Sequence, residues 1–146
     1  KTVKVDVPDN IELDVTVDNF EDDPYAFLDH DQFIQVLSNL VKNSFNAMEE
    51  EGGTLSILAK GRVNDIIFKV KDTGEGIPEK HLSKIFEPFF TTKKRGKGTG
   101  LGLSVIYGII KMHNGDIKVD SNDDPAKGPT GTEFTIKIPR DKGVKK

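Results

Sequence analysis

The chain has 146 residues, of which 35% are hydrophobic and 31% charged, and its formal net charge is −3. This length fits one domain, residues 1–146, and the acidic balance argues against a general nucleic-acid-binding protein. The sequence contains no cysteine, which excludes disulfides, a thiol nucleophile and a thiolate metal site. His30, His81 and His113 lack the spacing of metal ligands, and no apolar run approaches the ~20 residues of a membrane span.

The first elements along the chain are predicted to be two strands and a long helix. Residues 3–7 and 11–17 alternate apolar and polar side chains around a Pro-Asp-Asn turn, which predicts a hairpin. From residue 31 to about 50 the period becomes helical, and the glycines at 52 and 53 are expected to end this helix. Its apolar positions, spaced by three or four residues, are Phe33, Val36, Leu37, Leu40, Val41, Phe45 and Met48.

The rest of the chain adds more strands and two further helices. Strands are predicted at 55–59, 66–70, 117–119 and 132–138, and helices at 79–86 and 101–112. Residues 93–99 have no apolar face and are expected to form a mobile loop. This order predicts an α+β fold, a two-layer sandwich. About three helices would lie on one face of a mixed, mostly antiparallel sheet of about five strands, beside the N-terminal hairpin.

A glycine-rich stretch precedes the last predicted helix. Gly98, Gly100 and Gly102 alternate with other residues directly before the apolar segment 104–112. Without side chains, these positions let the backbone approach a bulky anion, and the helix start points its free N–H groups at the same place. The stretch therefore predicts a phosphate site. Such spacing also arises by chance, so the prediction depends on the motifs that accompany it.

The helix at 31–50 carries a polar face opposite its apolar stripe. Asn39, Asn43 and Asn46 recur on this face, together with Gln35 and Lys42. Asn is a poor helix former, because its side chain competes for backbone hydrogen bonds. Either the face is simply solvated, or an amide oxygen ligates Mg²⁺ while its neighbours bind phosphate, since Mg²⁺ prefers hard oxygen ligands.

Two further segments fit a nucleotide site. Asp72 follows an apolar strand and precedes Gly74 and Gly76. A carboxylate there can accept a hydrogen bond from an adenine amino group, although Asp-Xaa-Gly is also an ordinary turn. The aromatic stretch 85–90 is either local core or the anchor of a lid over a ligand. The cations that follow it are either solvated surface or phosphate ligands, and they are Lys93, Lys94, Arg95 and Lys97.

Four of these segments together resemble the N, G1, F and G2 boxes of sensor histidine kinases. They are Asn39-Leu-Val-Lys-Asn43, Asp72-Thr-Gly74-Glu-Gly76, Phe86-Glu-Pro88-Phe89-Phe90 and Gly98-Thr-Gly100-Leu-Gly102-Leu103. Their order and spacing match over about residues 29–138, and His113-Asn-Gly115 and Gly131-Thr132-Glu-Phe134 resemble the family's closing segment. The string Phe-Phe-Thr-Thr-Lys and the short lid are similar to the nitrogen-regulator-type subgroup. The resemblance implies the Bergerat fold of gyrase-type, chaperone, kinase and mismatch-repair ATPases.

The resemblance also implies a role for individual residues toward ATP (or ADP) and Mg²⁺. Asn43 would ligate Mg²⁺, Asp72 would accept a hydrogen bond from the adenine amino group, and Thr132 would reach the adenine through water. The glycines at 98, 100 and 102 would wrap the phosphates. The expected catalytic residues are Asn39, Lys42 and Lys93. Further nucleotide contacts are expected at Asn46, Gly74, Gly76, Ile77, Phe89, Thr92, Gly98, Thr99, Gly100, Leu101, Gly102 and Leu103.

Asn39 bears on which reaction the domain performs. In the hydrolytic members of the fold that this chain resembles, a Glu stands one helical turn before the Mg²⁺-ligating Asn and acts as general base toward water. Asn39 cannot accept a proton. We therefore expect slow hydrolysis and transfer of the phosphoryl group to a histidine, driven by positioning and charge neutralisation.

The acceptor histidine is expected to lie outside these 146 residues. None of the three histidines stands in the His-Glu-Xaa-Xaa-Xaa-Pro context that such kinases phosphorylate. The expected partner is therefore the histidine-containing dimerisation domain of the same kinase, encoded upstream with any sensor, and through it a response regulator. The isolated domain is expected to be monomeric and cytoplasmic, within a parent protein that is membrane-anchored or soluble. The alternatives are a serine kinase of the anti-sigma-factor type, a Bergerat-fold ATPase and a nucleotide-gated interaction domain.

Overall fold

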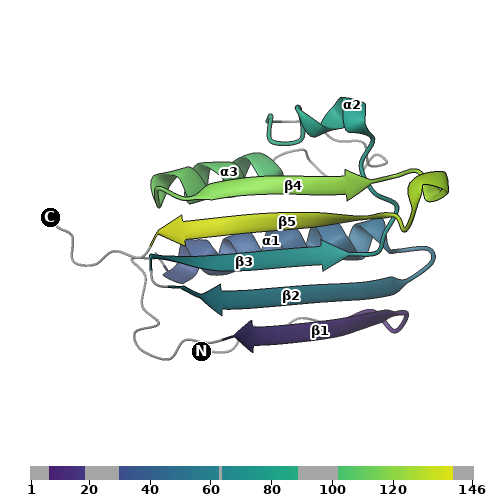
Figure 1. Ribbon diagram of the computed structural model, residues 1–146, viewed down its shortest axis with the longest axis horizontal. Helices are drawn as coiled ribbons and strands as arrows, with labels where there is room; N and C mark the ends of the chain where they lie inside the picture. The colour runs from purple at the N-terminus through teal and green to yellow at the C-terminus, as the bar shows by residue number, and fades with distance from the viewer. Residues whose placement is uncertain (1–6, 19–29, 63, 89–101, 140–146) are drawn as a thin grey trace, which may run out of the picture.

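The computed structural model describes residues 7–18, 30–62, 64–88 and 102–139 (Figure 1). The strands are β1 (Ile11–Asp18), β2 (Gly53–Gly61), β3 (Asp65–Asp72), β4 (Asp116–Asn122) and β5 (Gly131–Pro139). The helices are α1 (His30–Ala47), α2 (Glu79–Leu82) and α3 (Gly102–Met112), and a single 3-10 turn, η1 (Pro125–Lys127), interrupts the loop between β4 and β5. The types and order of the elements predicted from residue 11 onward are confirmed, but the helix predicted at 79–86 ends already at Leu82.

The strands form one five-stranded sheet in the order β1-β2-β3-β5-β4. β1 pairs with β2 in parallel, and every other pair is antiparallel, so the sheet is mixed as predicted. The parallel pair needs a long crossover connection, and α1 lies within it. Of the predicted N-terminal hairpin, the described residues contain only the second arm, which is β1. Val7 lies outside any strand, and residues 3–6 lie outside the described part.

The two long helices, α1 and α3, cover one face of the sheet (Figure 1). The core between the two layers is built from apolar side chains of both helices and of the strands. Those with no exposed surface are Val36, Leu40, Leu55, Val70, Ile106, Ile110 and Ile136. Burial of this apolar surface is the main favourable term in folding. The predicted two-layer α+β sandwich is confirmed.

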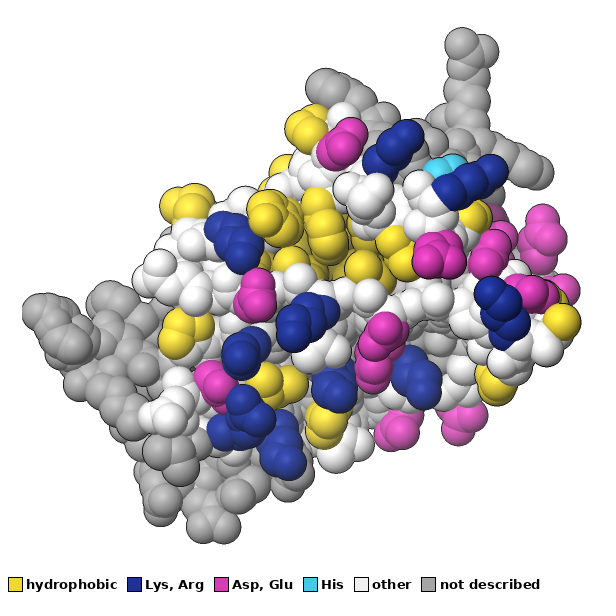
Figure 2. Space-filling view, turned by 45° about the horizontal axis from the view of Figure 1, so that its top comes forward, with side chains coloured by type: hydrophobic (Ala, Val, Ile, Leu, Met, Phe, Trp, Pro, Cys, Tyr) yellow, Lys and Arg dark blue, Asp and Glu magenta, His cyan; other side chains and the backbone are white. Residues whose placement is uncertain are grey.

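Among the described residues, no helix covers the opposite face of the sheet, and charged side chains gather there. In β5, Ile136 and Ile138 are buried against the helices while Lys137 between them is exposed. The same alternation places Lys69 and Lys71 of β3 and Lys118 of β4 on the open face, part of which Figure 2 shows with its blue lysines. One buried and one solvated face explain why the strand segments alternate so regularly in the sequence.

The first long helix ends earlier than the sequence predicts, whereas α3 ends at Met112 as predicted. α1 ends at Ala47, before residue 50, because the carbonyl of Ala47 accepts a hydrogen bond from the backbone N–H of Glu75 (3.2 Å) and not from the next helical turn. After α3, the left-handed residue is Asn114 (φ 60°), while the N–H of Gly115 bonds to the carbonyl of Ile110 (2.9 Å). The α3 end is therefore a Schellman motif with Asn114 in the position usually held by glycine.

Within the described ranges, no helix is long and apolar enough to cross a lipid bilayer.

Candidate nucleotide-binding site

Asp72, the last residue of β3, is a buried carboxylate with only 3% of its surface exposed. Its Oδ1 accepts hydrogen bonds from the backbone N–H groups of Gly74 (2.9 Å) and Thr132 (3.2 Å). Thr132 stands directly opposite Asp72 in the antiparallel pair of β3 and β5. Burying a charged group is costly unless hydrogen bonds compensate it, and these two bonds also fix the orientation of the carboxylate.

The loop after Asp72 is clamped between the end of α1 and the end of β4. The N–H of Glu75 donates to the carbonyl of Ala47. A Cβ on Gly74 would lie 2.6 Å from that carbonyl oxygen, and a Cβ on Gly76 (φ 81°) would lie 2.1 Å from the carbonyl oxygen of Asn122. Both glycines of the Asp-Thr-Gly-Glu-Gly string are therefore required by the packing of the protein itself.

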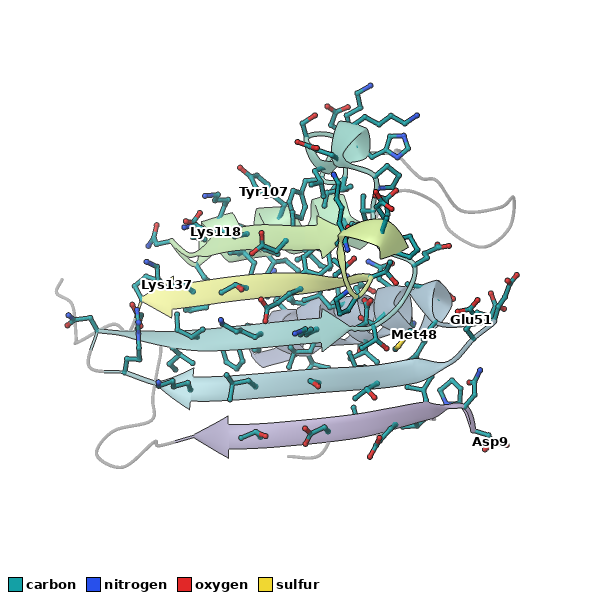
Figure 3. The ribbon with its side chains drawn as sticks, turned by 45° about the vertical axis from the view of Figure 1, so that its right-hand side comes forward. Asp9, Met48, Glu51, Tyr107, Lys118 and Lys137 are labelled. Carbon is teal, nitrogen blue, oxygen red and sulfur yellow. The ribbon has the colours of Figure 1, made fainter. Side chains whose placement is uncertain are left out.

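Thr73 fastens the start of this loop to β2, and the sequence interpretation assigned it no role. Its Oγ1 accepts a hydrogen bond from the N–H of Thr54 (3.0 Å) and lies 3.8 Å from the sulfur of Met48. Met48 follows α1 and stands at the same end of the molecule as this loop (Figure 3). The side chain of Thr73 thus joins β2, the loop and the turn after α1.

Ser121, near the end of β4, is a second residue that the sequence interpretation missed. It lies opposite Thr132 in the pair of β4 and β5, and the two hydroxyl oxygens are 2.7 Å apart. The Ser121 Oγ also accepts a hydrogen bond from the N–H of Ile77 (2.7 Å) and donates one to the carbonyl of Gly131 (2.9 Å). The sequence did contain a sign of this role. Ser121 is a polar residue at the next inward-facing position of β4 after the apolar Ile117 and Val119.

The predicted polar face of α1 is present, and its residues are on the whole less buried than those of the apolar stripe. Asn39 and Asn43 are half-buried, whereas Lys42 and Asn46 are exposed. Asn43 and Asn46 belong to the last turn of α1, which ends at Ala47 against the loop after Asp72. The structure therefore brings the end of the Asn-rich helix, the Asp72 carboxylate and the Thr132–Ser121 pair to one end of the sheet (Figure 1).

The remaining predicted residues fall into two groups. Gly102 is the first residue of α3, and Leu103 and Ile77 pack against the hydrophobic core. Phe86 of the aromatic stretch packs on Tyr107 and Phe134, with ring centroids 5.3 and 6.5 Å away, so it belongs at least partly to the core. Outside the described residues lie Phe89, Thr92, Lys93, Gly98, Thr99, Gly100 and Leu101, and with them the predicted loop at 93–99.

The family match and the sequence relatives of this chain agree with one another. Residues 28–142 match the family described as histidine kinase-, DNA gyrase B- and HSP90-like ATPase. Sporulation kinase A of Bacillus subtilis is 47% identical over 120 residues, which cover 82% of this chain and 18% of that protein. The sensor histidine kinase ZraS of Salmonella typhimurium is 44% identical over 112 residues, covering 76% of this chain and 22% of that protein.

Solved structures agree with the sequence relatives. The mycobacterial sensor histidine kinase MprB superposes with a TM-score of 0.75 at 27% identity, covering 90% of this chain and 84% of that one. The nucleotide-free catalytic domain of the histidine kinase ThkA superposes with a TM-score of 0.70 at 34% identity, covering 88% and 80% of the two chains. The chain thus matches a catalytic domain nearly end to end, but it spans only about a fifth of the length of the curated relatives it matches.

Proposed function

The chain belongs to the family of histidine kinase-, DNA gyrase B- and HSP90-like ATPases, and we propose that it is the catalytic domain of a sensor histidine kinase, which binds ATP beside Asp72. The observation that carries the proposal is the buried carboxylate of Asp72, held by two backbone N–H groups at the end of β3. A carboxylate accepts hydrogen bonds only, so it complements the amino group of adenine. Thr132, whose N–H is bonded to the same carboxylate, would contact the base with its hydroxyl.

The phosphates would extend from this base site toward the end of α1 and the start of α3. Gly102 begins α3, whose first N–H groups have no partner within the helix and favour an anion. Gly98, Thr99, Gly100 and Leu101 precede it, and Lys93 follows the aromatic stretch, as in the sequence-based prediction. Lys42 is an exposed cation on the Asn-rich face of α1 and would neutralise phosphate charge.

Asn43 is the residue that we propose as the protein ligand of Mg²⁺. Its donor chemistry fits, because it offers an amide oxygen on a half-buried face beside the proposed base site, and a Mg²⁺ ion bound to phosphates needs few protein oxygens. Mg²⁺ at this position would neutralise charge on the triphosphate. Asn46, one turn from Lys42 and more exposed than Asn43, would contact the nucleotide from the same face.

Asn39 favours phosphoryl transfer over hydrolysis. It lies one helical turn before Asn43 on the same face of α1, where a carboxylate base could have activated water. An amide cannot take a proton at this position. The bound ATP would therefore survive until a histidine of the dimerisation domain reaches its γ-phosphoryl group, and a response regulator would receive that group next.

The partner domain would dock around Tyr107 of α3. Tyr107 is a large side chain that remains partly exposed, and its ring rests on Phe86. Figure 2, which turns the edge of β4 and α3 toward the viewer, shows apolar side chains gathered in its upper middle and ringed by charged ones. A patch of this kind is typical of a protein interaction site.

Mixing the domain with a histidine-containing hairpin and ATP labelled at the γ-phosphate tests the proposal. We expect label on the hairpin at a site that is labile in acid and stable in base, and slow release of phosphate from the domain alone. Rapid phosphate release without the hairpin would identify an ATPase. Label on a serine would identify a kinase of the anti-sigma-factor type, and ATP binding without either reaction would identify an interaction domain.

A further inference from the structure

The hydroxyl groups of Ser121 and Thr132 form a network whose hydrogen positions are determined by its partners. The Oγ of Ser121 has three polar neighbours, namely the N–H of Ile77 (2.7 Å), the carbonyl of Gly131 (2.9 Å) and the Oγ1 of Thr132 (2.7 Å). A serine hydroxyl has one hydrogen to donate and two lone pairs to accept with. Three neighbours therefore use its complete capacity.

Two of the three directions follow from the chemistry of the neighbours. The N–H of Ile77 can only donate, so it occupies one lone pair of Ser121. The carbonyl of Gly131 can only accept, so it takes the single hydrogen of Ser121. The contact with Thr132 then has one favourable form, in which Thr132 donates its hydroxyl hydrogen to the remaining lone pair, because two oxygen lone pairs facing each other at 2.7 Å would repel.

We propose that Ser121 is a positioning residue that makes the hydroxyl of Thr132 act toward a ligand only as a hydrogen-bond acceptor, and so makes the site select 6-amino purines. The hydrogen of Thr132 is committed to Ser121, and its Oγ1 keeps only lone pairs for a ligand. Asp72, bonded to the N–H of Thr132, is also an acceptor. Two neighbouring acceptors favour the amino group of adenine and disfavour the 6-oxo group of hypoxanthine or guanine.

The same network couples the base site to the loop after β3. The backbone N–H of Ile77 donates a hydrogen bond to the Oγ of Ser121. Gly76 packs against Asn122, the residue that follows Ser121 in β4. The end of β4 therefore fixes both the position of the loop after β3 and the orientation of the Thr132 hydroxyl. This inference rests on the proposed binding of adenine beside Asp72.

The test compares the affinities for ATP and ITP, which carry a 6-amino and a 6-oxo group, by calorimetry on the purified domain. In Ser121→Ala the Thr132 hydroxyl can turn and donate, so we expect the ratio of ATP to ITP affinity to fall about tenfold, the equivalent of one hydrogen bond. Ser121→Thr keeps a hydroxyl and should restore most of the ratio. A merely structural role would lower both affinities equally and leave the ratio unchanged, which would overturn the proposal.

A second variant keeps the test decisive if Ser121→Ala folds poorly. Thr132→Val preserves the shape of the side chain and removes the hydroxyl, so we expect a similar fall in the ratio, with no further fall when Ser121→Ala is added. A further fall would contradict the proposal. Ser56→Ala, on the open face of β2, is the matched control and should change nothing. Loss of ATP binding in Asp72→Asn with an unaltered ratio in Ser121→Ala would overturn this inference alone, whereas full ATP affinity in Asp72→Asn would overturn the base site itself.

Discussion

At the scale of single residues, the proposed site depends on side chains whose orientation the backbone holds. Asp72 is buried, and its Oδ1 is occupied by the N–H groups of Gly74 and Thr132. An asparagine can keep those two bonds with its own amide oxygen, which directs its NH₂ group to the place of the second carboxylate oxygen. Substitution here therefore changes the chemistry presented to a ligand more than it changes the fold.

Asp72→Asn should consequently weaken ATP binding about 100-fold, because an amide donor replaces an acceptor opposite the adenine amino group and a charged hydrogen bond is lost. Isothermal calorimetry measures the affinity, and thermal unfolding serves as the control that the domain stays folded. Unchanged affinity would show that Asp72 does not contact the base.

Asn43→Ala should weaken ATP binding about tenfold in the presence of Mg²⁺ and hardly at all with EDTA, because the lost amide oxygen matters only through the ion. Fluorescence titration of a nucleotide analogue under both conditions measures the difference. Gln35→Ala, exposed two turns earlier on the same helix face, is the matched control. An equal loss with and without the ion would place the metal elsewhere.

At the scale of elements, the ends of the two long helices depend on hydrogen bonds and backbone conformations that the apolar periodicity does not reveal. The apolar spacing of α1 continues to Met48, but the helix ends at Ala47 because the loop after β3 competes for the Ala47 carbonyl. At the end of α3, His113 donates from Nδ1 to the carbonyl of Ile109 (2.8 Å), and Asn114 adopts the left-handed conformation. Gly115 is needed for a different reason, since a Cβ there would lie 2.7 Å from the carbonyl oxygen of Lys137.

Asn114 offers a test of this helix end. Asn114→Gly should raise the free energy of unfolding by about 0.5 kcal/mol, because glycine adopts a positive φ without steric cost, whereas Asn114→Ala should lower it by about 1 kcal/mol. Urea unfolding monitored by circular dichroism measures both. The opposite order of the two variants would mean that this conformation does not limit stability.

At the scale of the whole molecule, the sheet, α1 and α3 hold the proposed nucleotide site at one end and leave the α3 side open to a partner. Tyr107 is 41% exposed, packs on Phe86 and lies under the ammonium of Lys111, 5.5 Å from the ring centroid. Figure 3 shows it at the outer edge of the molecule, beyond β4. Aromatic side chains in such positions commonly contribute most of the binding energy of an interface.

Tyr107→Ala should therefore slow phosphoryl transfer to the histidine-containing hairpin at least about tenfold while leaving ATP affinity within about twofold. Tyr107→Phe keeps the ring and should behave like the unaltered domain. Lys118→Ala, an exposed change on the open face of the sheet, is the control for nonspecific effects. Equal transfer rates in Tyr107→Ala and Lys118→Ala would exclude α3 as the docking surface.

Much of this organisation was predictable from the sequence, because it is encoded locally. Alternation identified the strands, the three- and four-residue spacing identified α1, and the order of the four boxes indicated the family that the comparisons confirm. The assignment to a nitrogen-regulator-type subgroup and the roles of the individual site residues stay predictions. The Asp-Xaa-Gly pattern indicated a turn at Gly74, but the contacts of Gly74 with Ala47 and of Gly76 with Asn122 were not foreseen.

What the sequence by itself determined is therefore the type and order of the elements from residue 11 onward, the class of fold and the family, since these depend on side-chain periodicity and on short motifs in a fixed order. Only the tertiary structure decided the parallel pairing of β1 with β2, the early end of α1 and the network around Ser121. These features join groups far apart in the chain, such as Ile77 with Ser121 and Asp72 with Thr132. Hydrogen bonds of this kind leave no periodic trace in the sequence, because they depend on which strands become neighbours in the sheet.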